Sequence, residues 1–139
     1  MKISVHLKTL LDQLKSDHAE LVQEVRDLQI AYTQEARQTI KCLYRSFGPR
    51  NEATRLRVDW YRHEFKTTPS GRKVRPRRID TGKSYNQSIK FMGAIDLQHQ
   101  QLFNRYEPRL AVIRELADRN ADSRKIIEKH LAAAERLGQ

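Results

Sequence analysis

The sequence is poor in the residues that build disulfides, zinc sites and large cores. Cys42 is the only cysteine among the 139 residues, so an intrachain disulfide is excluded, and so is a zinc site built on several cysteines. Aromatic residues make up 7% of the chain and apolar residues 38%, below the usual range for a globular domain. A large core is therefore not expected, and much of the apolar content must lie in narrow helical stripes.

Long apolar runs are also missing. Residues 1–17 hold no unbroken apolar stretch of the length found in a signal peptide, and no segment of the sequence approaches the length of a membrane span. We therefore expect a soluble, cytoplasmic protein. The length of the chain is that of a single domain, residues 1–139.

Glycine and proline are absent from residues 1–47, which predicts one long N-terminal helix. Its apolar residues recur at alternating spacings of four and three, the 3.5-residue repeat of a coiled-coil seam. The seam positions are Leu7, Leu11, Leu14, His18, Leu21, Val25, Leu28 and Tyr32. The helix is expected to run from about Ser4 to Ser46 and to end at Gly48-Pro49. Its stripe needs a second helix, from elsewhere in the chain or from another copy, and we expect a homodimer through this seam.

Histidines offer no metal site. His18 lies on the seam, where we interpret it as a partly buried polar residue that sets the helix register, with a pH switch or a metal ligand as the alternative. The other histidines are scattered and form no HxH, HxxxH or HxxE arrangement. No bound metal is therefore predicted.

Acidic residues are scarce in one stretch, Thr54–Phe91. It carries eleven lysine and arginine residues against three acids, a net charge of +8 out of +10 for the whole chain. It also holds the only tryptophan and two of the five tyrosines. The charge of the protein is therefore concentrated in one segment, which points to a polyanionic partner.

The same stretch is the part of the sequence that reads as strand. Leu56, Val58 and Trp60 alternate with polar residues, which predicts a half-buried strand, and a twist or bulge is expected near residues 62–64 because Phe65 falls on the opposite face. Residues 67–71 form a turn signal. The returning strand is expected over residues 73–80, at an edge of the sheet, because Pro76 lacks an amide donor.

Residues 88–138 are predicted to be helical. Asn86 or Ser88 is expected to cap the first of these helices, Pro108 to kink it or to start a new one, and residues 120–122 to form a break. The predicted fold class is α+β, mostly α. A long, coiled-coil-like N-terminal helix over residues 1–47 is joined by a central basic β-hairpin over 54–85 to C-terminal helices over 88–138.

Two partial catalytic motifs fall inside the basic stretch. Residues 80–84, Asp-Thr-Gly-Lys-Ser, end like the phosphate-binding loop GxxxxGK[ST], but Arg77 occupies the place of the first glycine and no buried apolar strand precedes it. Asp59 with Glu64-Phe65-Lys66 resembles a nuclease metal site, but strand alternation places the two carboxylates on opposite faces. We therefore expect a non-enzymatic protein without a cofactor, with a metal-dependent nuclease as the less favoured alternative. Lys83 and the amides around Gly82 still suit one backbone phosphate.

Nucleic acid is the partner that the basic stretch predicts, with DNA favoured over RNA. Arginine suits bidentate contacts to phosphate or guanine, and tyrosines can stack on bases, whereas Trp60 is expected in the core. The predicted nucleic-acid-binding residues are Arg55, Arg57, Tyr61, Arg62, Lys66, Arg72, Lys73, Arg75, Arg77, Arg78, Lys83, Tyr85 and Lys90. The Arg/Lys face and the turn after Phe65 are expected to meet the ligand, opposite the apolar face. The alternative is a coiled-coil adaptor or structural protein whose hairpin docks on an acidic partner.

A short pattern in this stretch continues into the following helix. It consists of Trp60-Tyr61-Arg62, Gly82-Lys83-Ser84-Tyr85, Glu107 and Ile113-Arg114. It resembles the MobI-like family, small proteins encoded by conjugative elements and needed to mobilise DNA from a transfer origin. The resemblance covers roughly residues 55–115 and leaves out the N-terminal helix and the tail after Asn120. It implies an accessory DNA-binding protein that helps a relaxase to start transfer, and no catalytic residue carries over.

Overall fold

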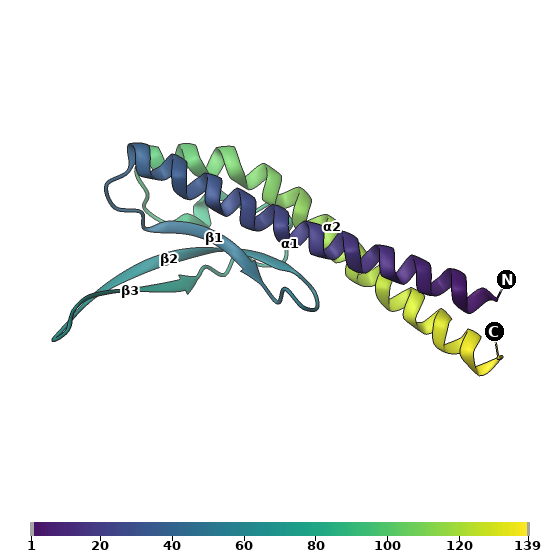
Figure 1. Ribbon diagram of the computed structural model, residues 1–139. Coiled ribbons are helices and arrows are strands. Elements are labelled where there is room, and N and C mark those ends of the chain that lie inside the picture. Colours follow the sequence, from purple (N-terminus) through teal and green to yellow (C-terminus); the bar gives the residue numbers. More distant parts are fainter. Residues whose placement is uncertain (1, 139) are drawn as a thin grey trace.

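Two long antiparallel helices cover one side of a small antiparallel sheet in the computed structural model, which describes residues 2–138 (Figure 1). Helix α1 spans Ile3–Thr39 and α2 spans Leu97–Arg136. The strands are β1 (Arg45–Arg50), β2 (Arg57–Thr68) and β3 (Gly71–Arg78), in the order β1-β2-β3, and a short 3-10 helix, η1 (Ile89–Met92), precedes α2. The predicted class, α+β and mostly α, is confirmed.

The first helix is shorter than predicted. It ends at Thr39, and Gly48-Pro49 lies inside β1 instead of terminating a helix. Strand β1 forms because it pairs with β2, Phe47 opposite Trp60, and both side chains are buried in the core. Gly48 lets α1 approach the sheet, since a Cβ there would lie 3.2 Å from Gln29 Nε2. Pro49 is tolerated because β1 is an edge strand.

Strands β2 and β3 pair residue by residue, from Tyr61 opposite Arg78 to Thr68 opposite Gly71. The register contains no extra residue, so the bulge expected near residues 62–64 is absent from this pair. Gly71 closes the turn with a φ of 120°, a conformation that side-chain-bearing residues rarely adopt. Strand β3 lies at an edge of the sheet, as Pro76 indicated.

The second helix is continuous. It passes through Pro108 and through residues 120–122, where a kink and a break were expected. Asn120 does not end the helix because its side chain is used between helices, its Nδ2 donating to the carbonyl oxygen of Leu14 over 2.8 Å. The N-cap is Asp96, whose carboxylate accepts from the His99 amide, while Ser88 caps η1 and Asn86 caps no helix among the described residues.

The apolar stripe of α1 is covered by α2 of the same chain and, near its C-terminal end, by the sheet. Val25, Leu28 and Tyr32 are buried there. The Tyr32 ring centroid lies 5.7 Å from that of Trp60 and 5.3 Å from that of Tyr106, both edge to face. Of the two partners that the sequence left open for this stripe, the helix from elsewhere in the chain is therefore the one found.

His18 is buried on the α1 stripe, as its seam position predicted. Its Nε2 donates to the carbonyl oxygen of Glu52 in the loop between β1 and β2. No group of three metal-ligating side chains occurs within residues 2–138. No helix in this part of the chain is long and apolar enough to cross a membrane.

The N-terminal part of α1 and the C-terminal part of α2 extend beyond the sheet as a pair (Figure 1). We call this pair, residues 3–15 and 123–136, the stalk. At the other end of the molecule the turn between β2 and β3 projects past the helices. We call β2, β3 and their turn, residues 57–78, the ribbon. The two ends therefore present very different surfaces.

Candidate nucleic-acid interface

The ribbon carries eight basic residues and two acidic ones, a net charge of +6. Every residue of β3 is exposed. Among residues 2–138, most of the predicted binding residues have no ion pair. These residues are Arg62, Lys66, Arg72, Lys73, Arg75, Arg78, Lys83 and Lys90. The ribbon and the loop after it therefore hold a set of accessible, uncompensated positive charges.

The register sorts these charges by face. Arg62 lies opposite Arg77, and Lys66 opposite Lys73, so these side chains share one face with Glu64 and Arg75. This face is the continuation of the Trp60 face, because positions 60, 62, 64 and 66 alternate in phase. The sequence had placed the Arg/Lys face opposite the Trp60 face, and this holds only for Arg57, Arg72 and Arg78. The other five basic residues of the ribbon lie on the Trp60 face. The aromatic and apolar residues past Tyr61 lie on the other face instead.

On that other face, Phe65 lies opposite Val74 and His63 opposite Pro76. The Arg72 guanidinium carbon lies 4.5 Å from the centroid of the Phe65 ring, a cation–π contact. His63 Nε2 and Ser46 Oγ are 2.6 Å apart and share a hydrogen bond. Burial lowers the pKa of His63, and the positive charges of Arg45 and His99 lower it further. This face therefore carries a smaller share of the positive charge of the ribbon than the Trp60 face.

Some predicted binding residues are engaged inside the protein. Arg55 pairs with Asp118 and Asp122, and the hydrogen bonds to these carboxylates raise its pKa. Arg57 also reaches Asp118, at 3.2 Å, while Arg77 pairs with Glu64 of the ribbon. Arg55 and Arg57 therefore help to hold the start of β2 against α2.

The two tyrosines predicted to stack on bases lie in β2 and in the loop after β3, and their stacking role stays a prediction. The Tyr85 hydroxyl donates to Asp118 Oδ2 over 3.0 Å, which raises the pKa of Tyr85. Tyr61 is half-buried in the sheet, and Lys90 lies in η1, outside the ribbon. Trp60 is 1% exposed, in agreement with the core role predicted for it.

A buried polar network joins the sheet, the loop after β3 and α2. Its centre is Glu107, which is 5% exposed. Glu107 Oε1 accepts from Trp60 Nε1 over 3.0 Å, and Glu107 Oε2 accepts from the Gln87 amide over 3.0 Å and from Arg114 Nη1 over 2.8 Å. Both charges of the Glu107–Arg114 pair are compensated in this way.

Arg114 extends the network to two backbone carbonyls. Its Nε donates to Val58 on β2, and its Nη1 donates to Tyr85 in the loop, both over 2.8 Å. The loop over residues 81–88 is therefore fixed at several points although it contains no strand. Sequence reasoning singled out Glu107 and Arg114 only as parts of a family pattern. The signal in the sequence that could have indicated a buried ion pair is that both charged residues lie on an apolar face of the helix.

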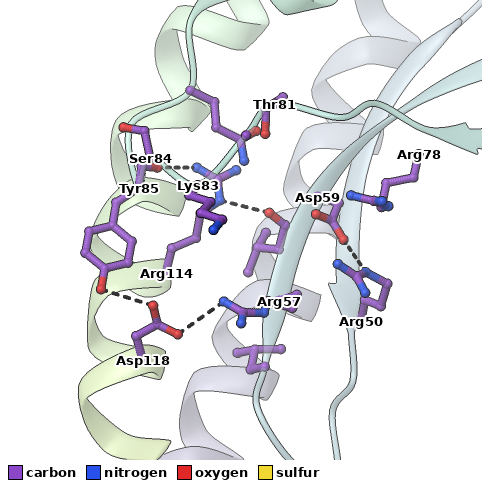
Figure 2. A pocket seen from close by; sticks show the side chains of 14 residues that line it. Arg50, Arg57, Asp59, Arg78, Thr81, Lys83, Ser84, Tyr85, Arg114 and Asp118 are labelled. Atoms are coloured by element: carbon purple, nitrogen blue, oxygen red, sulfur yellow. Dashed lines mark hydrogen bonds and ion pairs between the residues drawn. The ribbon is translucent and has the colours of Figure 1, made fainter. Parts of the chain in front are cut away.

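A pocket of about 320 Å³ opens between this loop, the sheet and α2 (Figure 2). Its lining includes five basic side chains, Arg50, Arg57, Arg78, Lys83 and Arg114, and two acidic ones, Asp59 and Asp118. Arg50 Nε lies 2.7 Å from Asp59 Oδ2, and this hydrogen bond raises the pKa of Arg50. Asp59 and Glu64 project from opposite faces of β2, so these two carboxylates cannot share one metal ion.

Comparison with family models gives one match, the model described as MobI protein, over residues 12–128. The chain belongs to the MobI family. The match is wider than the resemblance over residues 55–115, because it also takes in most of α1 and the first part of the tail after Asn120. Neither the curated proteins nor the solved structures gave a match. Membership of the MobI family suggests a role in conjugative mobilisation.

The residues that carry the family pattern meet in space. Trp60, Glu107 and Arg114 form the network, and the Tyr85 carbonyl is one of its acceptors. The pattern therefore describes how the loop is held on the scaffold. The exposed charges of β3 lie outside it.

Proposed function

We propose that this MobI-family protein is a non-enzymatic DNA-binding accessory factor that helps to start conjugative transfer at a transfer origin. The observation that carries the proposal is the ribbon, whose exposed basic residues mostly lack carboxylate partners within residues 2–138. Such a charge density is unfavourable in isolation and is relieved by a polyanion.

The dimensions of the ribbon suit duplex DNA. Eight residues of β3 span roughly 26 Å at 3.3 Å per residue, enough to pass several phosphates. A two-stranded ribbon also fits the major groove, which is about 12 Å wide. The face that holds Arg62, Lys66, Lys73 and Arg75 is the contact surface in this proposal.

Competition binding across duplex DNA, single-stranded DNA and RNA tests the proposal. If about five side chains neutralise phosphates, the logarithm of the affinity for duplex DNA falls against the logarithm of salt concentration with a slope of roughly −4 to −5. We expect duplex DNA to compete best. Tighter binding of RNA, or no binding at low salt, contradicts the proposal.

A charge-matched pair of variants tests the location of the interface. Lys66→Gln/Lys73→Gln/Arg75→Gln removes three charges from the contact surface and is expected to make the salt slope shallower by about 2.7, since each phosphate contact contributes about 0.9. Lys8→Gln/Lys125→Gln/Lys129→Gln removes three exposed charges from the stalk and is expected to leave the slope unchanged. Equal effects of the two variants contradict a ribbon interface.

A second candidate function is an adaptor whose ribbon docks on an acidic protein. Val74 on the ribbon is 53% exposed and faces Phe65 across the strands, so one face offers an apolar contact beside the charges. A protein partner buries such a face, whereas phosphates do not. In the mobilisation context a relaxase or another transfer protein is the proposed partner. Val74→Thr weakens a protein complex in this case and leaves DNA affinity unchanged.

The homodimer also stays a proposal. Because α2 covers the α1 stripe, two copies have to meet through apolar side chains that the helices leave exposed, among them Leu10 and Ile126 on the stalk. The stalk lies at the opposite end of the molecule from the turn of the ribbon (Figure 1). A dimer formed there leaves both ribbons free for DNA.

A further inference from the structure

The pocket beside the 81–85 loop lies at the start of β2, and both faces of that strand line it. Arg57 and Asp59 come from the Tyr61 face and Val58 from the Trp60 face, while the ribbon residues Arg62, Lys66, Lys73 and Arg75 are not among its lining residues. Figure 2 shows Arg114, Lys83 and Arg78 around the same space. The pocket is therefore a second concentration of positive charge with its own geometry.

Most of the charges in the pocket are already balanced. Arg50 forms an ion pair with Asp59, and Arg114 forms one with Glu107. Arg55 and Arg57 both pair with Asp118. Arg78 and Lys83 have no ion pair within residues 2–138. Two exposed cations therefore line a recess whose other charges are compensated, so both are available to a bound anion.

Neutral donors complete the lining. Thr81 is 8% exposed and lines the pocket beside Ser84, and the buried Nη2 of Arg114, which lines it as well, has no hydrogen-bond partner within residues 2–138. A polar side chain that is buried to this extent normally has a partner. Gly82 has a φ of 76°, and no atom lies within 4 Å of the place of its missing Cβ, so the backbone there is open to a ligand.

The loop is held in place before any ligand binds. The Gly82 amide donates to Asp80 Oδ1 over 3.1 Å, the Tyr85 carbonyl accepts from Arg114, and the Gln87 amide donates to Glu107. A preorganised set of donors binds an anion at a smaller entropic cost than a flexible loop does.

We propose that this pocket binds one phosphate group, with Arg78 and Lys83 as the charged contacts and the Thr81 and Ser84 hydroxyls as neutral donors. The inference rests on the proposed function, because it makes the pocket a discrete phosphate site of the nucleic-acid interface. The phosphate comes from a nucleic-acid backbone or terminus, or from a free phosphate compound. Two cations and two hydroxyls in one pocket suit the several oxygens of a phosphate better than a lone cation does.

Titration with inorganic phosphate, followed by amide chemical shifts in NMR at constant ionic strength, tests the pocket without DNA. We expect the amides of Gly82, Lys83 and Ser84 to shift saturably. In Arg78→Gln/Lys83→Gln the affinity falls by about tenfold or more, since both charge-assisted contacts are lost. The matched control Lys66→Gln/Lys73→Gln removes two ribbon charges and leaves the titration unchanged. Thr81→Val tests the hydroxyl with nearly the same side-chain shape and weakens phosphate binding.

Shifts that spread along the whole ribbon, that chloride reproduces, or that persist in Arg78→Gln/Lys83→Gln overturn the inference and leave the ribbon proposal standing. A saturable phosphate site in a protein that binds no nucleic acid overturns the proposed function and leaves a site for a free phosphate compound. A third experiment distinguishes a phosphate of the nucleic-acid backbone from a terminal phosphate. A duplex with terminal phosphates that binds more tightly than the same duplex without them assigns the pocket to a terminus, and equal binding assigns it to the backbone.

Discussion

Trp60 and Glu107 are joined by a buried hydrogen bond of 3.0 Å, although they lie 47 residues apart in the chain. The indole N–H comes from the central strand β2 and the carboxylate from α2. Because Glu107 also accepts from Arg114 and from the Gln87 amide, one carboxylate links the sheet, the second helix and the loop that forms the pocket wall. The position of the loop over residues 81–88 therefore depends on a buried carboxylate in α2.

Glu107→Ala is expected to destabilise the protein strongly. The substitution leaves the Arg114 guanidinium buried without its counter-charge and removes the acceptor of the Trp60 indole. Breaking a buried pair on one side costs about 3–5 kcal/mol. Urea denaturation followed by circular dichroism measures the loss in the free energy of unfolding. The control is Glu115→Ala, which breaks an exposed pair with Arg119 on the same helix. An equal, small loss in both variants contradicts the structural role of Glu107.

The fold could be predicted from the sequence wherever one periodicity continued without interruption. The α1 stripe and the alternation of Leu56, Val58 and Trp60 each predicted an element that the structure contains. Prediction failed where one residue type serves two purposes. Gly48 and Pro49 are common at helix ends, but here glycine makes room for Gln29 and proline occupies an edge strand. Only the tertiary contact distinguishes these cases.

The candidate site was predicted in composition and not in geometry. Local charge located the ribbon, since the excess of arginine and lysine is a property of the sequence. The sequence does not reveal which arginines have partners, because Asp118 and Asp122 lie more than 60 residues from Arg55. The face was also misjudged for five of the eight basic residues of the ribbon, since Arg62 continues the Trp60 face past the point where the helices end.

The turn of the ribbon is expected to depend on Gly71. Its φ of 120° places any side chain in a strained conformation, so Gly71→Ala costs about 1–3 kcal/mol locally. The strain falls on the pairing of β2 with β3 and hardly affects the helices. Hydrogen exchange should therefore speed up at ribbon amides such as Phe65 and Val74, with helix amides unchanged. Ser70→Ala at the same turn is the control, because the φ of Ser70 is not positive and an alanine there is not strained. Unchanged exchange in Gly71→Ala contradicts this account of the turn.

Stability is expected to fall as the pH drops below about 6.5, the ordinary pKa of histidine, partly because of His63. Burial, with Arg45 and His99 nearby, lowers the pKa of His63 in the folded state. Between its folded and unfolded pKa values the unfolded chain binds more protons, so the free energy of unfolding decreases as the pH falls. Urea denaturation from about pH 7 to pH 5 measures the slope, and His63→Gln is expected to flatten it. NMR titration of the ring should give a midpoint below 6.5, and a higher midpoint contradicts the assignment.

Self-association through the stalk is the remaining proposal that a substitution can decide. Leu10 is 52% exposed and Ile126 is 54% exposed, and both line an apolar pocket of about 250 Å³ between the two helices. A stable dimer buries about 800 Å² on each copy, which a pair of long helices can supply. Sedimentation velocity is expected to show a dimer for the natural chain and a monomer for Leu10→Asp/Ile126→Asp. Ile30→Asp, at a residue that is 56% exposed on α1 away from the stalk, is expected to stay dimeric. A monomeric natural chain contradicts the dimer, and a dimer that survives both stalk substitutions contradicts its location.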